Sequence, residues 1–442
     1  MSYWSNSELD LQAMLNEIGV KDFEELITNI PQDLRFKGEY RLPEGLSELE
    51  ARQLLESLAQ KNKTLVPFAG AGAYDHYVPA IVDEIASRPE FYTSYTPYQP
   101  EVSQGNLQVM YEFQSLICAI TGMDVTNASM YEAGSALAEA ILLSIGHTRN
   151  KKVLIPSTLN PRYKSIIKTY LNNIDAQLVE IPAKKFTLDM EFAARELDDS
   201  AACVVVQSPN YFGFLENVAR FDALRQDKKA LLIHAYDPIS LGVLKPPAYY
   251  HADIAVAEGQ ALGNHLNYGG PYVGLFSVKA DLVRKMPGRI AGETKDVDGR
   301  TGYVMTLQTR EQHIRREKAT SNICTNSGLL TTRAAIYLTA LGKNGFQQVS
   351  RLCLQKAHYL AEELGKLPKV KLASAAPFFK EFTVELPKPA TEVIKGFMEH
   401  GILAGVGLEK EGLPNHLLIA VTEKRSVKEL DQYVKIMKSL VS

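Results

Sequence analysis

The stretch that decides the fold reads ADIAVAEGQALGNHLNYGGP and covers residues 252–271. It begins with an apolar run at 253–256, passes through a loop rich in glycine and amide side chains, and leads to a second apolar run at 273–278. Short apolar runs of this kind, rich in β-branched residues, predict buried strands. Segments long enough for a crossover helix, such as 161–171 and 218–226, separate several further runs, which lie at 152–155, 177–181, 202–206 and 231–233. This alternation predicts an α/β fold whose large domain contains a mostly parallel sheet, covered by helices on both faces.

Three regions of different character follow one another along the 442 residues. Residues 1–65 predict an N-terminal arm of short helices, with a capping box at 47–50. Residues 66–335 carry the alternation of apolar runs and helical segments, so we expect the large α/β domain there. Residues 336–442 predict a long helical segment, which starts near residue 335 and is interrupted between 341 and 345, followed by alternating strands and helices. This order is typical of a smaller two-layer α+β domain.

Composition and charge exclude several classes of function. The net charge of -3 and the pI near 6.3 give the chain no overall attraction to nucleic acid or to an anionic membrane. No run approaches the ~18 apolar residues of a membrane-spanning helix, and the first residues do not resemble a signal peptide. The four cysteines are far apart without a C-x-x-C pair, and the nine histidines form no H-E-x-x-H motif. We therefore expect a soluble, cytoplasmic protein with buried free thiols, no metal site, and neither nucleic acid nor membrane as a partner.

The loop within residues 252–271 resembles the loop that carries the Schiff-base lysine in aminotransferase-type enzymes that depend on pyridoxal phosphate (PLP). Gln260 stands at the position of that lysine. The lone pair of an amide nitrogen is delocalised into its carbonyl group, so glutamine cannot form an imine with the cofactor aldehyde. The resemblance implies a type I, PLP-dependent aminotransferase-like fold that lacks its own covalent cofactor anchor and works with an active partner.

Three other motifs bear on cofactor binding. The loop 70–75 begins like a dinucleotide fingerprint but places Asp75 where the third glycine is needed, which favours a plain tight turn. Glu132 precedes a helix start that offers amides to the cofactor phosphate in PLP enzymes of this fold; its negative charge favours helix capping instead. At the aspartate that pairs with the pyridinium nitrogen in such enzymes, the registration predicts His234 rather than Asp237.

Two polar loops are candidates for a binding surface. Residues 91–105 combine aromatic rings, hydroxyls and amides; because a hydroxyl buried without a partner costs roughly 1–3 kcal/mol, such a loop makes a poor core. A binding surface and an ordered surface loop both remain open. Residues 309–326 join a basic helical run to a turn rich in hydroxyls and amides, which can present donors to an anion. A solvated face with charge pairs four residues apart is the alternative.

The chain resembles the first subunit (alpha, N-terminal type) of the two-subunit bacterial glycine dehydrogenase (decarboxylating), which is the P-protein of the glycine cleavage system. The resemblance extends over nearly the whole chain and is most specific at Gly70 to Pro79, Tyr95 to Gly105, Gly269-Gly270-Pro271, Met286-Pro287-Gly288-Arg289 and Leu307 to Arg316. It implies a heterotetramer with two copies of each subunit, in which subunit 2 binds PLP covalently. That enzyme decarboxylates glycine and transfers the aminomethyl group to the lipoyl arm of the H-protein.

The resemblance also implies a role for this chain's own residues. We expect no catalytic residue in this chain alone, and a contribution to the partner's cofactor or the lipoyl arm from across the subunit interface. The residues expected to make it are Tyr95, Thr96, Tyr98, Gln99, Thr320, Ser321 and Asn322. Two alternatives stay open: a self-sufficient PLP enzyme that uses another lysine, with Lys279 as the nearest candidate, and a purely structural or regulatory partner subunit.

Overall fold

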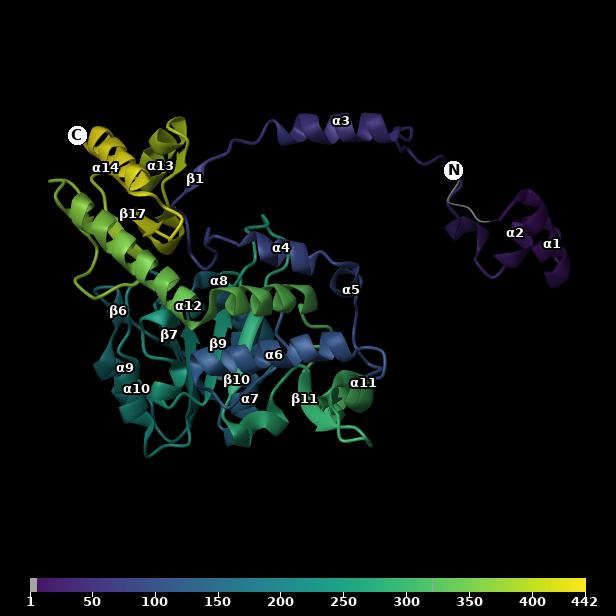
Figure 1. Ribbon diagram of the computed structural model, residues 1–442, viewed down its shortest axis with the longest axis horizontal. Helices are drawn as coiled ribbons and strands as arrows, with labels where there is room; N and C mark the ends of the chain where they lie inside the picture. Colours follow the sequence, from purple (N-terminus) through teal and green to yellow (C-terminus); the bar gives the residue numbers. More distant parts are fainter. Residues whose placement is uncertain (1–5, 320) are drawn as a thin grey trace. The chain divides into compact units, whose positions relative to one another are not determined.

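The computed structural model describes residues 6–319 and 321–442 of the chain. The chain divides into two units, Met1–Lys63 and Thr64–Ser442 (Figure 1). The first unit consists of short helices, which are α1 (Glu8–Ile18), α2 (Phe23–Leu26), a 3₁₀ turn (Gln32–Leu34) and α3 (Glu48–Ala59). The predicted capping box is present: Ser47 Oγ accepts from the Glu50 amide at 3.3 Å, and the Glu50 carboxylate accepts from the Ser47 amide at 2.9 Å.

The second unit is built around a seven-stranded sheet. Its strand order is β2-β10-β9-β8-β7-β3-β4. The five strands from β9 to β4 run parallel, whereas β10 runs antiparallel to both β9 and β2. The strands span Val125–Thr126 (β2), Gly274–Val278 (β10), Ile254–Glu258 (β9), Leu231–Tyr236 (β8), Ala201–Ser208 (β7), Lys152–Pro156 (β3) and Gln177–Ile181 (β4). The prediction of a mostly parallel sheet is therefore confirmed.

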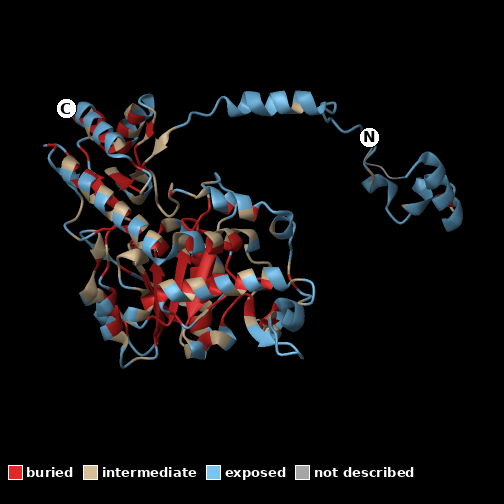
Figure 2. Ribbon diagram, in the orientation of Figure 1, coloured by how far each residue is buried: buried red, intermediate tan, exposed pale blue. Residues whose placement is uncertain are grey.

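Helices cover both faces of this sheet. Along β9, Ile254 and Val256 pack with α7 (Ala133–Thr148), whereas Ala255 and Ala257 pack in the cluster that contains α6 (Gln104–Thr121). Successive side chains of a strand point to opposite faces, so α7 and α6 lie on opposite sides of the sheet. The strands between these layers are buried (Figure 2). Other covering helices are α8 (Pro161–Leu171), α9 (Met190–Glu196) and α10 (Val218–Arg225).

The C-terminal part forms a second, two-layer arrangement. The helix α12 (Gly328–Gly365) lies beside α6 and is kinked at Gly342, where φ is +56°, close to the predicted break in the helical pattern (Figure 1). A four-stranded antiparallel sheet follows, with the order β13-β14-β17-β16. Its elements and covering helices are β13 (Lys371–Leu372), β14 (Glu381–Glu385), α13 (Ala390–Glu399), β16 (Val406–Leu408), β17 (Leu413–Ala420) and α14 (Val427–Val441). The domain boundaries at 66–335 and 336–442 stay a prediction, because α12 runs across residue 335.

Smaller elements bring the loops of the predicted site into place. The segments involved are α4 (Ala80–Ala86), α5 (Pro89–Tyr92), the hairpin β11 (Ile290–Lys295) with β12 (Thr301–Thr306), and α11 (Gln312–Arg315). A two-residue strand, β1 (Val66–Pro67), pairs in parallel with β15 (Ile402–Leu403). No helix among the described residues is long and apolar enough to cross a membrane.

Candidate functional site

Gln260 is a buried structural amide. It lies two residues after the end of β9, and only 1% of its surface is exposed. Its Oε1 accepts from the amide of Tyr74 at 2.8 Å, while its Nε2 donates to the carbonyl oxygens of Tyr74 at 3.1 Å and Asn264 at 2.8 Å. Gln260 therefore holds the loop around Tyr74 in place. A lysine ammonium has no acceptor for the Tyr74 amide, so this hydrogen-bond pattern needs an amide side chain.

The cleft next to Gln260 contains only a small cavity. The cavity at the carboxyl ends of the central strands has a volume of about 50 Å³, and its walls include Tyr74, Asp237, Glu258, Lys380 and Glu381. This volume holds one or two water molecules. Cofactors of doubly wound sheets bind at this end of the strands. This cavity is too small for PLP, and a second hollow of about 360 Å³ shares Gly72, Tyr163 and Glu258 with it.

Carboxylates also occupy the helix end that would bind a phosphate. Glu132 caps α7 and accepts from the amides of Gly134 and Ser135, the latter at 2.7 Å. Glu258 accepts from the Ala133 amide at 3.2 Å. Desolvation in the cleft, together with the nearby charge of Glu132, raises the pKa of Glu258 to about 8. The prediction that Glu132 caps the helix is confirmed, and a phosphate at this position would meet two carboxyl groups instead of free amides.

The registration that favoured His234 is wrong. Asp237, which follows β8, lines the cavity, whereas the ring of His234 lines a different small cavity beside Ser240 and Tyr250. Burial lowers the pKa of His234 to about 4. Because side chains alternate along a strand, Asp237 lies on the same face as Ala235, and both residues line the cavity. The predicted position differs from the observed one by an odd number of residues, so the prediction chose a side chain on the opposite face of β8.

Lys380 fills the place beside Asp237. Its side chain is 1% exposed, and its ammonium nitrogen lies 2.8 Å from Asp237 Oδ2 and 3.8 Å from the centre of the Tyr74 ring. An ammonium paired with a carboxylate lacks the free lone pair that imine formation requires. The other lysine under consideration, Lys279, donates to Asp253 Oδ1 at 2.6 Å. Both lysines are therefore engaged in ion pairs.

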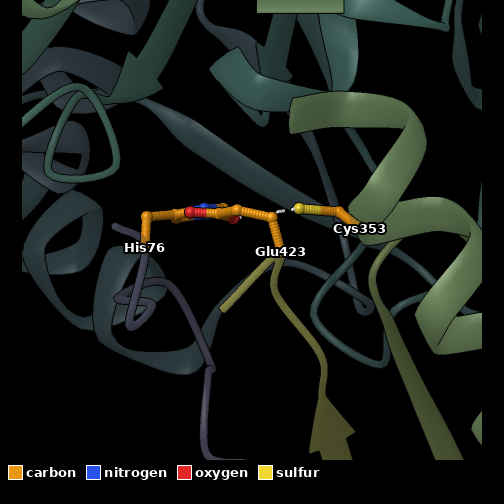
Figure 3. Close-up of side chains that lie close together, drawn as sticks. All are labelled: His76, Cys353 and Glu423. Atoms are coloured by element: carbon orange, nitrogen blue, oxygen red, sulfur yellow. Dashed lines mark hydrogen bonds and ion pairs between the residues drawn. The ribbon is translucent and has the colours of Figure 1, made fainter. Parts of the chain in front are cut away.

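Three side chains of the types that bind metals lie close together next to Lys380. The ligand atoms of His76, Cys353 and Glu423 lie within 4.8 Å of one another (Figure 3). His76 Nδ1 is 2.7 Å from Glu423 Oε2, and Cys353 Sγ is 3.4 Å from the same oxygen. Lys380 Nζ lies 3.0 Å from His76 Nε2. When Lys380 donates to Nε2, the ring proton sits on Nδ1 and points to Glu423, so neither nitrogen is free for a cation.

The ionisation of this group fits a chain of hydrogen bonds. Burial raises the pKa of the Cys353 thiol well above its ordinary value, which keeps it in the protonated form that binds metal poorly. Burial opposes ionisation of Glu423, yet hydrogen bonds from His76 and the Tyr77 amide lower its pKa to about 2. The order is therefore Lys380, His76, Glu423 and Cys353, which ties the loop around Tyr74 to the C-terminal layer.

A second, more exposed surface contains most of the residues predicted to reach the partner. The hydroxyl of Tyr95 lies 3.1 Å from Thr325 Oγ1, which joins the loops 91–105 and 309–326. Arg289 donates to Thr96 Oγ1 at 3.1 Å and to the hydroxyl of Tyr98 at 2.9 Å. The structure thus brings the two loops, which are about two hundred residues apart, onto one surface.

The predicted residues differ in their exposure on this surface. Tyr95 is 79% exposed and Tyr98 is 47% exposed. Gln99 and Asn322 are also exposed, whereas Thr320 lies outside the described residues. Ser321 points inward: its hydroxyl donates to Glu139 Oε1 at 2.8 Å, and burial raises the pKa of Glu139 to about 7. The described cysteines are all free; Cys203 and Cys353 are buried as expected, but Cys324 is exposed on this surface.

Comparison with known proteins identifies the family. The family model for the glycine cleavage system P-protein matches residues 1–437. The chain belongs to this P-protein family. The proteins from Chloroherpeton thalassium and Carboxydothermus hydrogenoformans, each named probable glycine dehydrogenase (decarboxylating) subunit 1, are 49% identical to it. The first covers 100% of both chains and the second 99%.

Solved structures confirm the fold of this P-protein family member. A crystal structure of glycine decarboxylase (P-protein) of the glycine cleavage system, in inhibitor-bound form, matches with a TM-score of 0.93 at 38% identity over 100% of both chains. The Burkholderia pseudomallei sphingosine-1-phosphate lyase matches with a TM-score of 0.67 at 14% identity, over 93% of this chain and 94% of that one; this likeness shows the fold alone. The predicted PLP-type fold is therefore confirmed.

Several residues of this P-protein surface and cleft were missed from the sequence. Lys380 gives no local signal, because it lies just before β14 and far from Gln260 in the sequence, yet enters the same cleft. Glu258 lies within the quoted stretch, but its role depends on Ala133 in another element. Arg289 and Glu311 belong to segments that carried the family resemblance; their side-chain pairing was not apparent from either segment alone.

Proposed function

We propose that this chain is the subunit of glycine decarboxylase that does not anchor the cofactor, and that it completes the active site of a second, PLP-bearing subunit. The observation that carries the proposal is the environment of Gln260. A buried amide with three hydrogen bonds stands where a lysine would bind PLP, next to a cavity of about 50 Å³. The relatives named subunit 1 support the existence of a subunit 2.

The reaction proposed for the assembled enzyme is the decarboxylation of glycine, followed by transfer of the aminomethyl group to the lipoyl arm of the H-protein. PLP, bound covalently by the second subunit, supplies the electron sink for this chemistry. The role of this chain is to shape the site and exclude water, since a leaving carboxylate is lost more readily from a dry, preorganised pocket. The exposed surface around Tyr95, Tyr98, Gln99 and Asn322 offers the hydroxyl and amide groups for this role. We propose a cytoplasmic heterotetramer with two copies of each subunit.

The proposal is tested by separating the subunits. The purified chain is mixed with PLP, reduced with borohydride and digested, and the peptides are searched for a pyridoxyl-lysine. We expect no modified lysine on this chain, and labelling of the second subunit in the same experiment serves as the positive control. Release of carbon dioxide from glycine is expected only when both subunits are present. A stable, reducible adduct on this chain, or turnover by this chain alone, contradicts the proposal.

A further inference from the structure

Arg289 is a buried guanidinium at the start of β11. It is only 1% exposed and is the largest fully buried side chain among residues 6–319 and 321–442. Arginine is seldom fully buried unless every donor has a partner. The turn before it is held firmly: Arg310 donates to the carbonyl oxygens of Met286 and Gly288, the latter at 2.9 Å, and the Ala128 amide donates to the Arg289 carbonyl at 2.7 Å. The backbone that carries Arg289 is therefore fixed.

The guanidinium connects three separate segments. Nε donates to Glu311 Oε2 at 3.3 Å, one terminal nitrogen donates to Thr96 Oγ1 at 3.1 Å, and the other donates to the Tyr98 hydroxyl at 2.9 Å. The second of these nitrogens also lies 3.7 Å from Cys324 Sγ. The Arg289 carbon Cζ is 5.2 Å from the centre of the Tyr98 ring. One rigid cation thus sets the positions of two hydroxyls that belong to a surface loop.

The Arg289–Glu311 ion pair is not expected to contribute much to the stability of the fold. Removing two charges from water has a desolvation penalty that often exceeds the attraction between them. Glu311 is 5% exposed, and its Oε1 has no hydrogen-bond partner within the described part of the chain. Its other oxygen serves Arg289 and lies 3.5 Å from His313 Nδ1. Such a buried carboxylate oxygen can be completed by an ordered water, an ion or a donor of another molecule.

We propose that Arg289 and Glu311 form a positioning pair, which orients the hydroxyls of Thr96 and Tyr98 toward the cofactor site of the second subunit. This inference rests on the proposed function and adds two residues that do not themselves touch the reacting atoms. Lysine cannot replace arginine in this role, because a single ammonium on a flexible stem does not reproduce the planar fork that serves Thr96, Tyr98 and Glu311 together.

The test uses the enzyme assembled from both subunits and compares Arg289→Lys, Tyr98→Phe and the double variant. Arg289→Lys keeps the charge next to Glu311, and Tyr98→Phe keeps the ring. A misplacement of about 1 Å in an active site can lower the rate about 100-fold. We expect each single variant to lower kcat by ~10- to 100-fold with little change in KM for glycine. The matched control is Arg284→Gln, an exposed arginine five positions away, which should retain parental kinetics.

The double variant distinguishes positioning from a general structural effect. If Arg289 acts through Tyr98, the double variant loses no more activity than the worse of the two single variants, because coupled residues are not additive. Parental kcat in Arg289→Lys, or losses that multiply in the double variant, overturns the proposal. Size-exclusion chromatography shows whether Arg289→Lys still assembles with the second subunit. If it does not, the double variant Thr96→Val, Tyr98→Phe tests the same hydroxyls with Arg289 intact. An unchanged kcat in that variant overturns the proposal. Failure of the proposed function is seen separately, as turnover by the unsubstituted chain without its partner.

Discussion

Placing a lysine at position 260 should not create a cofactor site. In Gln260→Lys, the hydrogen bonds to the Tyr74 carbonyl and the Asn264 carbonyl depend on a longer, charged side chain, and the Tyr74 amide loses its acceptor. A hydrogen bond contributes about 1 kcal/mol, and a buried donor left unsatisfied costs about 1–3 kcal/mol. The new ammonium also enters a site that is 1% exposed and already holds Lys380 near by. We expect the free energy of unfolding to fall by about 3–5 kcal/mol.

The assay combines urea unfolding with a PLP titration followed by absorbance. Gln260→Met serves as the matched variant, because methionine has a similar volume, removes the same hydrogen bonds and adds no charge. Its free energy of unfolding should therefore fall less than that of Gln260→Lys, and the difference is the cost of the buried ammonium. Neither variant should develop the absorbance of a PLP–lysine adduct, because the cavity holds only about 50 Å³ and Glu132 and Glu258 occupy the helix end. A Gln260→Lys protein of parental stability that binds PLP and is labelled by borohydride refutes the reasoning.

Three further predictions concern the groups that close the cleft. Glu132→Ala removes the cap of α7 and should lower the free energy of unfolding by about 1–2 kcal/mol in urea, whereas an unchanged midpoint contradicts the capping role. Because the pKa of Glu258 is raised to about 8, the unfolded chain releases this proton at lower pH than the folded chain, so the stabilising effect of the protonated group is lost between about pH 4.3 and pH 8. Glu258→Gln should therefore gain stability relative to the parent as the pH rises from 5.5 to 8 in thermal unfolding, and parallel pH profiles of the two proteins count against it. Lys380→Met leaves Asp237 without its buried cation and should lower the free energy of unfolding by about 3–5 kcal/mol. Most of this loss should be recovered in the double variant that also carries Asp237→Asn. Equal losses in the single and double variants rule out the ion pair as the cause.

Local patterns were enough to predict much of this fold. The apolar runs at 202–206 and 231–233 became β7 and β8, because a strand buried on both faces needs continuous apolar residues whatever surrounds it. The break before residue 345 became the kink at Gly342, since glycine tolerates a positive φ. Glu132 was correctly predicted as a cap, because a capping interaction involves only the next three residues.

The face of β8 was the point where local reasoning failed. A count that is wrong by one position reverses every side chain of a strand, and the sequence contains no marker for the exact end of β8. The choice between His234 and Asp237 therefore needed the coordinates of the neighbouring strands and of Lys380. The positions of Tyr95, Thr96 and Tyr98 were correctly predicted as a surface loop with polar groups, but not the buried arginine that holds two of them.

The sequence by itself determined that this chain lacks an amine at Gln260, because the chemistry of an amide nitrogen is a property of the side chain and does not depend on its surroundings. Only the tertiary structure decided that the chain's own side chains also narrow the cleft. Tyr74, Asp237, Glu258 and Lys380 come from separate elements of the chain, and their meeting depends on how the sheet, the helix ends and the C-terminal layer pack together. Contacts of this kind are set by the geometry of the whole fold, so no local pattern records them.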